Sequence, residues 1–254
     1  MTKSLFWKSK LLANHGFTGI FSLRNGGFST GAYASLNLGH GLGDLRENVE
    51  KNLSFLINAA GLNGRPHQAR QIHGTGILMC DGPGKMHEAA ADILLSFRSG
   101  MAVSVRVADC LPILLADPDS GMVAAVHAGW RGTSQNIASK AVRAMRNLGA
   151  KAGNILAALG PCIGPCCFTL QKETWQLLSQ CSDNAKSHPP GKEPYVADLA
   201  AINMVQLSRA GLLPSHIDRL QACTSCQTAS FFSYRRDNGK TGRHLAIVGC
   251  STDA

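Results

Sequence analysis

Three short segments of the chain each carry a side chain that binds metal ions or acts in nucleophilic catalysis. His73 lies in the sequence QIHG, Cys110 in ADC and His127 in VHAGWRG. Two imidazoles and one thiolate are enough to hold a zinc ion, and they leave one coordination position for water or substrate, as catalytic zinc sites do. The same thiol beside an imidazole base would also suit a cysteine nucleophile. The three residues together indicate an enzyme.

Two of these residues flank neighbouring strand-like runs. Cys110 directly precedes the apolar run Leu111–Ala116, and His127 ends the run Met122–His127. The turn-forming sequence DPDSG joins the two runs, so we expect them to pair as an antiparallel hairpin. That pairing would place Cys110 and His127 at the same end of the sheet. No local argument of this kind places His73, which lies 37 residues before Cys110.

The remaining pattern alternates between strand-like and helix-like segments. Further strands are expected at Phe17–Leu23, Ala91–Ser96, Ala102–Val107, Ile155–Leu159 and His244–Gly249. Helices are expected over Glu47–Ala60, from an Asp198 cap to Gly211, and after a Thr133 cap, with Ile137, Ala141, Ala144, Met145 and Leu148 on its inner face. No linker composition interrupts the pattern. We therefore expect one α/β domain over residues 1–254, built on a mixed central β-sheet flanked by helices.

Charge and composition limit the partners. The net charge of +9 favours an anionic ligand, but the basic residues are scattered and only 6% of residues are aromatic. Few aromatic platforms argue against nucleic acid and leave a small anionic substrate as the better expectation. No apolar run is long enough to span a membrane. An odd number of cysteines, nine, without a signal-peptide pattern favours the reducing cytoplasm.

Five of the eight cysteines outside the triplet lie in two groups. Cys162, Cys166 and Cys167 are close together in GPCIGPCC, and Cys223 and Cys226 form a single CxxC. A structural zinc joining Cys162, Cys166, Cys223 and Cys226 is an alternative metal site, although a second CxxC is missing. Packing is the default role for these thiols.

Taken in order, the motifs resemble one known family. They are SLRNGGFS at 22–29, SLNLG at 35–39, QIHG at 71–74, ADCLPI at 108–113, VHAGWRG at 126–132, GPCIGPCC at 160–167, and FSYRR at 232–236 with TGR at 241–243. This set is similar to the YfiH family, also called the multicopper polyphenol oxidase or laccase-domain family. One departure is visible, because many members have an acidic residue where this chain has Thr169.

The resemblance implies an α/β fold of the YfiH type, which is similar to the cytotoxic necrotizing factor fold. It also implies a zinc ion held by His73, Cys110 and His127. Members are described as phosphorolysing adenosine, inosine and methylthioadenosine and as deaminating adenosine. Other members are linked to peptidoglycan editing, and older descriptions call the family laccases.

Three function classes remain open. The first is a zinc-dependent purine nucleoside phosphorylase acting on nucleoside and phosphate, with catalytic roles for Cys110, His127 and Asp109. Arg24 and Asn37 are then candidates for holding phosphate or ribose. The second is a cysteine hydrolase or amidase acting on peptidoglycan precursors, and the third a binding module without catalysis. Copper could replace zinc in a weak polyphenol oxidase, but none of the nine histidines forms the H-x-H pairs that build a laccase cluster.

Overall fold

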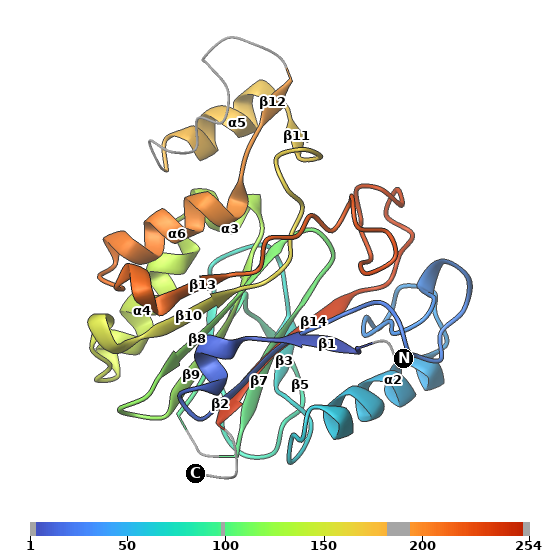
Figure 1. Cartoon of the computed structure of the whole chain (residues 1–254), viewed down its shortest axis with the longest axis horizontal. Coiled ribbons are helices and arrows are strands. Elements are labelled where there is room, and N and C mark those ends of the chain that lie inside the picture. Colours follow the sequence, from blue (N-terminus) through green and yellow to red (C-terminus); the bar gives the residue numbers. More distant parts are fainter. Residues whose placement is uncertain (1–3, 98–99, 182–193, 251–254) are drawn as a thin grey trace.

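Two β-sheets packed face to face form the centre of the molecule, and helices cover both outer faces (Figure 1). The computed structural model describes residues 4–97, 100–181 and 194–250. Apolar side chains of both sheets, such as Phe21, Val105, Leu114 and Ala125, interlock between them. The strands read as almost continuous apolar runs because both faces of each sheet are covered.

The first sheet has four antiparallel strands in the order β1–β2–β14–β7. Their bounds are β1 Phe6–Lys8, β2 Phe17–Ser22, β14 His244–Cys250 and β7 Ala102–Val107. The C-terminal strand β14 thus lies between β2 and β7. Strands from both ends of the described chain thus share one sheet. The single domain over residues 1–254 stays a prediction.

The second sheet has six strands in the order β13–β10–β8–β9–β6–β4 and is mixed, because β13 and β4 run parallel to their neighbours. The bounds are β13 Ile217–Arg219, β10 Leu156–Leu159, β8 Leu111–Asp117, β9 Met122–Ala128, β6 Ile93–Ser96 and β4 Ile77–Met79. Two short pairs lie outside these sheets: β3 Gln68–Arg70 with β5 Met86–Ala90, and β11 Thr169–Leu170 with β12 Tyr195–Val196.

The helices pack by their apolar stripes. Helix α2 (Arg46–Ala59) covers the outer face of the four-stranded sheet through Leu53 and Leu56. Helices α4 (Ile137–Asn147) and α6 (Leu199–Arg209) cover the six-stranded sheet through residues such as Val142 and Ile202. The shorter helices are α1 Lys10–Ala13, α3 Trp130–Ser134 and α5 Lys172–Ser179. No helix in the described part of the chain has the length and apolar character that crossing a membrane requires.

The expected α/β class, with a mixed sheet flanked by helices, is confirmed, and the principal strands and helices fall where the pattern predicts them. Two details were wrong. Thr133 does not cap the long helix, because it lies inside α3, where its buried hydroxyl accepts a hydrogen bond from Asn203. Asn136, with a left-handed φ of 59°, separates α3 from α4. Leu148 lies just beyond the end of α4 and is 47% exposed, not on the inner face.

Candidate metal centre and active site

The β8–β9 hairpin places Cys110 and His127 side by side. Residue pairs Leu111–Ala128 and Pro112–His127 face each other across the hairpin, so Cys110 and His127 lie at the same end of it. Both strands are completely buried. The position of these two side chains is therefore held by the rigid centre of the second sheet. The predicted hairpin is confirmed.

Asp92, just before β6, brings His73 to the same place. Its carboxylate is fully buried and accepts hydrogen bonds from four groups: the N–H groups of Ile72, His73 and Gly74, and Nδ1 of His127 at 2.8 Å. His73 adopts a left-handed φ of 60°, a costly conformation for a residue with a side chain, and it turns successive N–H groups toward one carboxylate. One carboxylate thus ties the His73 loop to the His127 strand.

The three predicted ligands meet as a result. The ligand atoms of His73, Cys110 and His127 all lie within 4.8 Å of one another. Because Asp92 binds Nδ1 of His127, the Nε2 atom of that ring is left for a metal ion, a usual arrangement at histidine metal sites. Two imidazoles and a thiolate with an open fourth position suit zinc. The donor set and its geometry therefore fit the ion that the sequence suggested.

Charge within the triplet favours an ionised pair. Burial alone would raise the pKa of Cys110, but the charge of His127 and hydrogen bonds from both histidines lower it to about 6. Burial would lower the pKa of His127, but the Cys110 thiolate and Asp92 raise it to about 9. Burial opposes the ionisation of Asp92 as well, yet its bonds to His127 and the backbone hold its pKa below the ordinary value. The thiol is thus prepared to act as a thiolate.

Asp109 lines the site but is held by three donors. The hydroxyls of Thr224 and Ser233 and the N–H of Arg235 donate to its carboxylate at 2.6, 3.0 and 2.7 Å. Asp109 is buried, and its φ of 86° is left-handed. A carboxylate so saturated with donors holds the surrounding loops in place. This geometry favours positioning over the predicted acid/base role, which stays untested.

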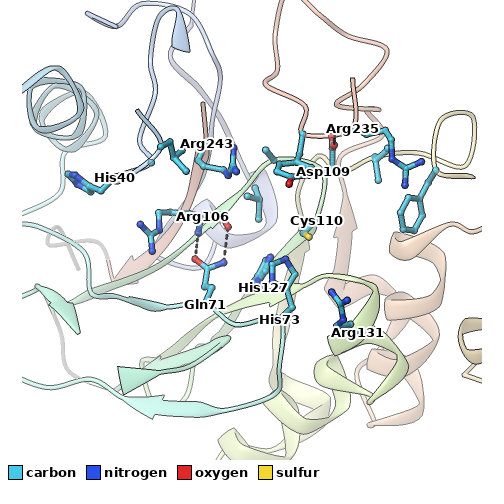
Figure 2. Close-up of a pocket in the computed structure, with 17 residues that line it drawn as sticks. His40, Gln71, His73, Arg106, Asp109, Cys110, His127, Arg131, Arg235 and Arg243 are labelled. Atoms are coloured by element: carbon cyan, nitrogen blue, oxygen red, sulfur yellow. Dashed lines mark hydrogen bonds between the residues drawn. The ribbon is translucent and has the colours of Figure 1, made fainter. Parts of the chain in front are cut away.

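A cavity of about 540 Å³ opens over the triplet. This volume is in the range of small-molecule sites, roughly 300–1,000 Å³. Figure 2 shows His73, Cys110 and His127 beside the cavity, with several arginines around them. Apolar side chains complete the lining: Leu42, Val107, Ala108, Ile163 and Phe168, with the ring of Tyr234. The cavity therefore offers metal ligands, positive charge and an apolar wall.

The positive charge comes from Arg106, Arg131, Arg235 and Arg243 (Figure 2). Within the described residues, no carboxylate forms an ion pair with any of the four. Burial, together with the charge of Arg243, lowers the pKa of Arg106. Repulsion of this kind is relieved when an anion binds between the two guanidinium groups. The cavity is prepared for an anion.

Two predicted binding residues lie away from this cavity. Arg24 donates to the carbonyl oxygens of Ala34 and Thr228 and lies over the ring of Phe232. Asn37 is fully buried, and its side-chain oxygen accepts the N–H of Arg243 at 2.9 Å. Neither residue lines the cavity. Their direct contact with phosphate or ribose remains a prediction, and the structure gives Asn37 an indirect position behind Arg243.

Several site residues were missed by sequence reasoning. Asp92 was included in a predicted strand without a role, although a carboxylate at the start of an apolar run needs buried partners. Gln71 was quoted only as part of a motif. Its side-chain amide donates to the Arg106 carbonyl and accepts from the Arg106 N–H, both at 2.8 Å, and so fixes the His73 loop to β7 (Figure 2). Arg131, Arg235 and Arg243 stand in quoted motifs, but no role was assigned to them from the sequence.

Two further groups of potential ligands exist among the described residues. His67, Cys80 and His87 form one. Both ring nitrogens of His67 already have hydrogen-bond partners, His87 and the Gly82 carbonyl, so we interpret this group as structural. The other consists of Cys166, Cys167, Cys223 and Cys226. Three members of the alternative zinc set considered from the sequence belong to this group, whereas Cys162 is buried in the core and Cys167 is the fourth member.

Comparison with known proteins identifies the family. Residues 18–251 match the family model described as "Multi-copper polyphenol oxidoreductase laccase". "Purine nucleoside phosphorylase YlmD" of Geobacillus stearothermophilus is 37% identical over 241 residues, which cover 89% of this chain and 87% of that protein. "Purine nucleoside phosphorylase YfiH" of Escherichia coli K12 is 34% identical over 228 residues, covering 89% and 91%.

A solved structure extends the likeness to the fold. The crystal structure of YlmD from Geobacillus stearothermophilus matches this one with a TM-score of 0.87 at 31% identity, covering 99% of this chain and 98% of that one. The resemblance expected from the motifs is thereby confirmed. The chain belongs to the multi-copper polyphenol oxidoreductase laccase family, and its relatives from Geobacillus stearothermophilus and Escherichia coli bear the name purine nucleoside phosphorylase.

Proposed function

We propose that the protein is a zinc-dependent purine nucleoside phosphorylase acting on adenosine, inosine and methylthioadenosine. One observation carries the proposal: a His₂Cys triplet lies in a cavity with four arginines that pair with no carboxylate of the described chain. A phosphate co-substrate would supply the missing negative charge. The names of the relatives support the same reaction.

In this proposal each part of the substrates contacts a different part of the cavity lining. Arg106 and Arg243, half-buried and mutually repelling, would hold the phosphate. Phe168, Ile163 and Tyr234 would pack against the purine ring, because aromatic and aliphatic surfaces favour such a base. The ribose would then lie between them, next to Cys110 and His127. This order brings a phosphate oxygen close to the anomeric carbon.

In phosphorolysis a phosphate oxygen bonds to C1′ of the ribose while the C1′–N9 bond breaks, and the purine leaves with the electron pair and takes up a proton. A zinc ion bound by His73, Cys110 and His127 would supply a Lewis acid next to the reacting groups. Asp92 orients His127 through Nδ1. Asp109 holds the loop that carries Arg235. The arginines bind and align the phosphate and balance its charge as the bonds change.

Deamination of adenosine is proposed as a second activity of the same cavity, in which water adds to C6 of the purine and the 6-amino group leaves as ammonia, so that inosine is formed. We also propose a cytoplasmic location, because all nine cysteines carry free thiols, which a reducing compartment preserves. Small nucleosides and phosphate are the partners in this proposal.

The test is to load the purified protein with zinc and to follow free purine and ribose 1-phosphate from each nucleoside, with and without phosphate. We expect phosphate-dependent turnover that is lost in Cys110→Ala. Cys181→Ala is the matched control, because Cys181 lies at the end of α5 outside the cavity. Zinc-loaded wild-type protein that leaves all three nucleosides intact would contradict the proposal. Loading with copper and a phenol substrate tests the laccase-like alternative in the same preparation.

A second candidate function has its own support. Cys110, His127 and Asp92 form a thiol–imidazole–carboxylate series, in which the His127 ring donates hydrogen bonds to the Cys110 sulfur and to the Asp92 carboxylate. This is the arrangement of a cysteine hydrolase, in which His127 would act as base. Such an enzyme would cleave an amide of a peptidoglycan precursor without metal. Metal-free protein that hydrolyses such amides and loses the activity on alkylation of Cys110 would favour this function.

A further inference from the structure

Four cysteines outside the cavity converge from two distant loops. Strands β10 and β13 are parallel neighbours, so the loops that follow them leave the sheet at the same end. The first loop carries Cys166 and Cys167, and the second carries Cys223 and Cys226. A backbone bridge between Cys162 and Cys223 joins the loops. All four Sγ atoms lie within 4.8 Å of one another.

We propose that Cys166, Cys167, Cys223 and Cys226 hold a structural zinc ion with four thiolate ligands. In a tetrahedral site with Zn–S bonds of about 2.3 Å, neighbouring sulfurs lie roughly 3.8 Å apart. The Sγ atom of Cys226 is 3.6 Å from that of Cys166 and 3.3 Å from that of Cys167. A disulfide would require about 2.05 Å. Both distances are far longer than a disulfide bond and lie near the spacing expected for ligands around one ion.

The chemistry of the surroundings supports a metal-bound thiolate cluster. The N–H of Gly164 donates to Sγ of Cys223 at 3.2 Å, a bond that stabilises negative charge on sulfur. Arg236 donates to the carbonyl oxygens of Thr224 and Ser225, so the backbone of the CTSC loop is already fixed. Four ionised thiols this close repel each other strongly, and a divalent cation removes that repulsion. Sulfur ligands alone favour zinc over magnesium or calcium.

Four protein ligands leave no position for substrate, so the role of this site is structural. It joins the two loops that form one wall of the cavity. The first loop also contains Ile163, whose N–H donates to the Asp109 carbonyl at 2.9 Å. The second contains Thr224, whose hydroxyl donates to the Asp109 carboxylate. Loss of the ion would loosen the support of Asp109, which directly precedes Cys110, whatever reaction the cavity performs.

The first experiment counts zinc per chain by elemental mass spectrometry after gel filtration. We expect Cys166→Ser/Cys226→Ser to carry one zinc ion fewer than the wild type. The matched control Cys181→Ser/Cys250→Ser removes two thiols outside the group and should keep the wild-type number. An unchanged zinc number in the Cys166→Ser/Cys226→Ser protein would overturn the proposal, as would iron in place of zinc.

The second experiment uses the wild-type chain, so it does not depend on the folding of a variant. Iodoacetamide labelling followed by peptide mass spectrometry should find the four thiols protected together, and exposed together after a zinc chelator. Cys181 should react equally in both states. A disulfide between Cys226 and Cys166 or Cys167, or four thiols that react freely before chelation, would overturn the site. Neither experiment measures nucleoside turnover, so its outcome is independent of the proposed function.

Discussion

Replacing Asp92 by Asn tests whether one buried carboxylate assembles the metal centre. The substitution keeps the shape of the side chain but turns one oxygen into an NH₂ group. In the wild type, one oxygen accepts from His73 and His127, and the other from Ile72 and Gly74. Whichever way the amide turns, two donors face another donor. The Asp92→Asn protein should therefore lose both stability and metal affinity.

The expected losses of unfolding free energy and of zinc affinity follow from these contacts. Asp92 is fully buried, and each buried donor that loses its acceptor costs about 1–3 kcal/mol, so the free energy of unfolding should fall by at least about 2 kcal/mol. Removing a carboxylate behind a metal-binding histidine typically weakens metal binding about 10–100-fold. Urea unfolding measures the first quantity, and competition with a chromophoric chelator measures zinc affinity.

The matched control is Glu88→Gln, which neutralises an exposed carboxylate on β5. It should change neither quantity. If Asp92→Asn retained the zinc affinity and unfolding free energy of Glu88→Gln, the carboxylate would not assemble the site, and the reasoning from its four hydrogen bonds would be refuted.

Three further predictions concern charge and protonation. Arg243→Gln should raise the KM for phosphate about 10–100-fold, because a charged hydrogen bond contributes about 1.5–3 kcal/mol; initial-rate kinetics with an unchanged KM would contradict it. In metal-free protein, the alkylation rate of Cys110 should rise with pH, with a midpoint near pH 6. In His127→Ala the midpoint should move to higher pH, because the charge and hydrogen bond of His127 no longer offset the effect of burial on the Cys110 pKa. Burial, with the charge of Arg24, lowers the pKa of His244 to about 3. Between about pH 6 and pH 3 the unfolded chain therefore binds a proton that the folded chain does not, so the free energy of unfolding should fall by about 1.4 kcal/mol per pH unit across this range. Chemical unfolding of His244→Gln at pH 7 and pH 5 should show a smaller fall, and an equal fall would count against this assignment.

Local patterns predicted most of the fold for a physical reason. Strands such as Ala102–Val107 and helices such as Leu199–Arg209 bury whole faces or stripes, so their apolar periodicity is visible in the sequence. The Asp198 cap is confirmed by its bond to the N–H of Ala201. One error arose where a residue's partner is distant in sequence. Thr133 matches a cap pattern, but its contact with Asn203 holds it inside a helix.

The sequence by itself determined the pairing of Cys110 with His127, since a short turn between two apolar runs leaves little choice of register. It also determined the family, through motifs spread over the whole chain. Only the tertiary structure decided that Asp92 collects the His73 loop, that arginines without carboxylate partners surround the cavity, and that Cys167 rather than Cys162 joins the second thiol group. These contacts join segments far apart in the chain. They depend on strand order and loop closure, which no local pattern of residues encodes.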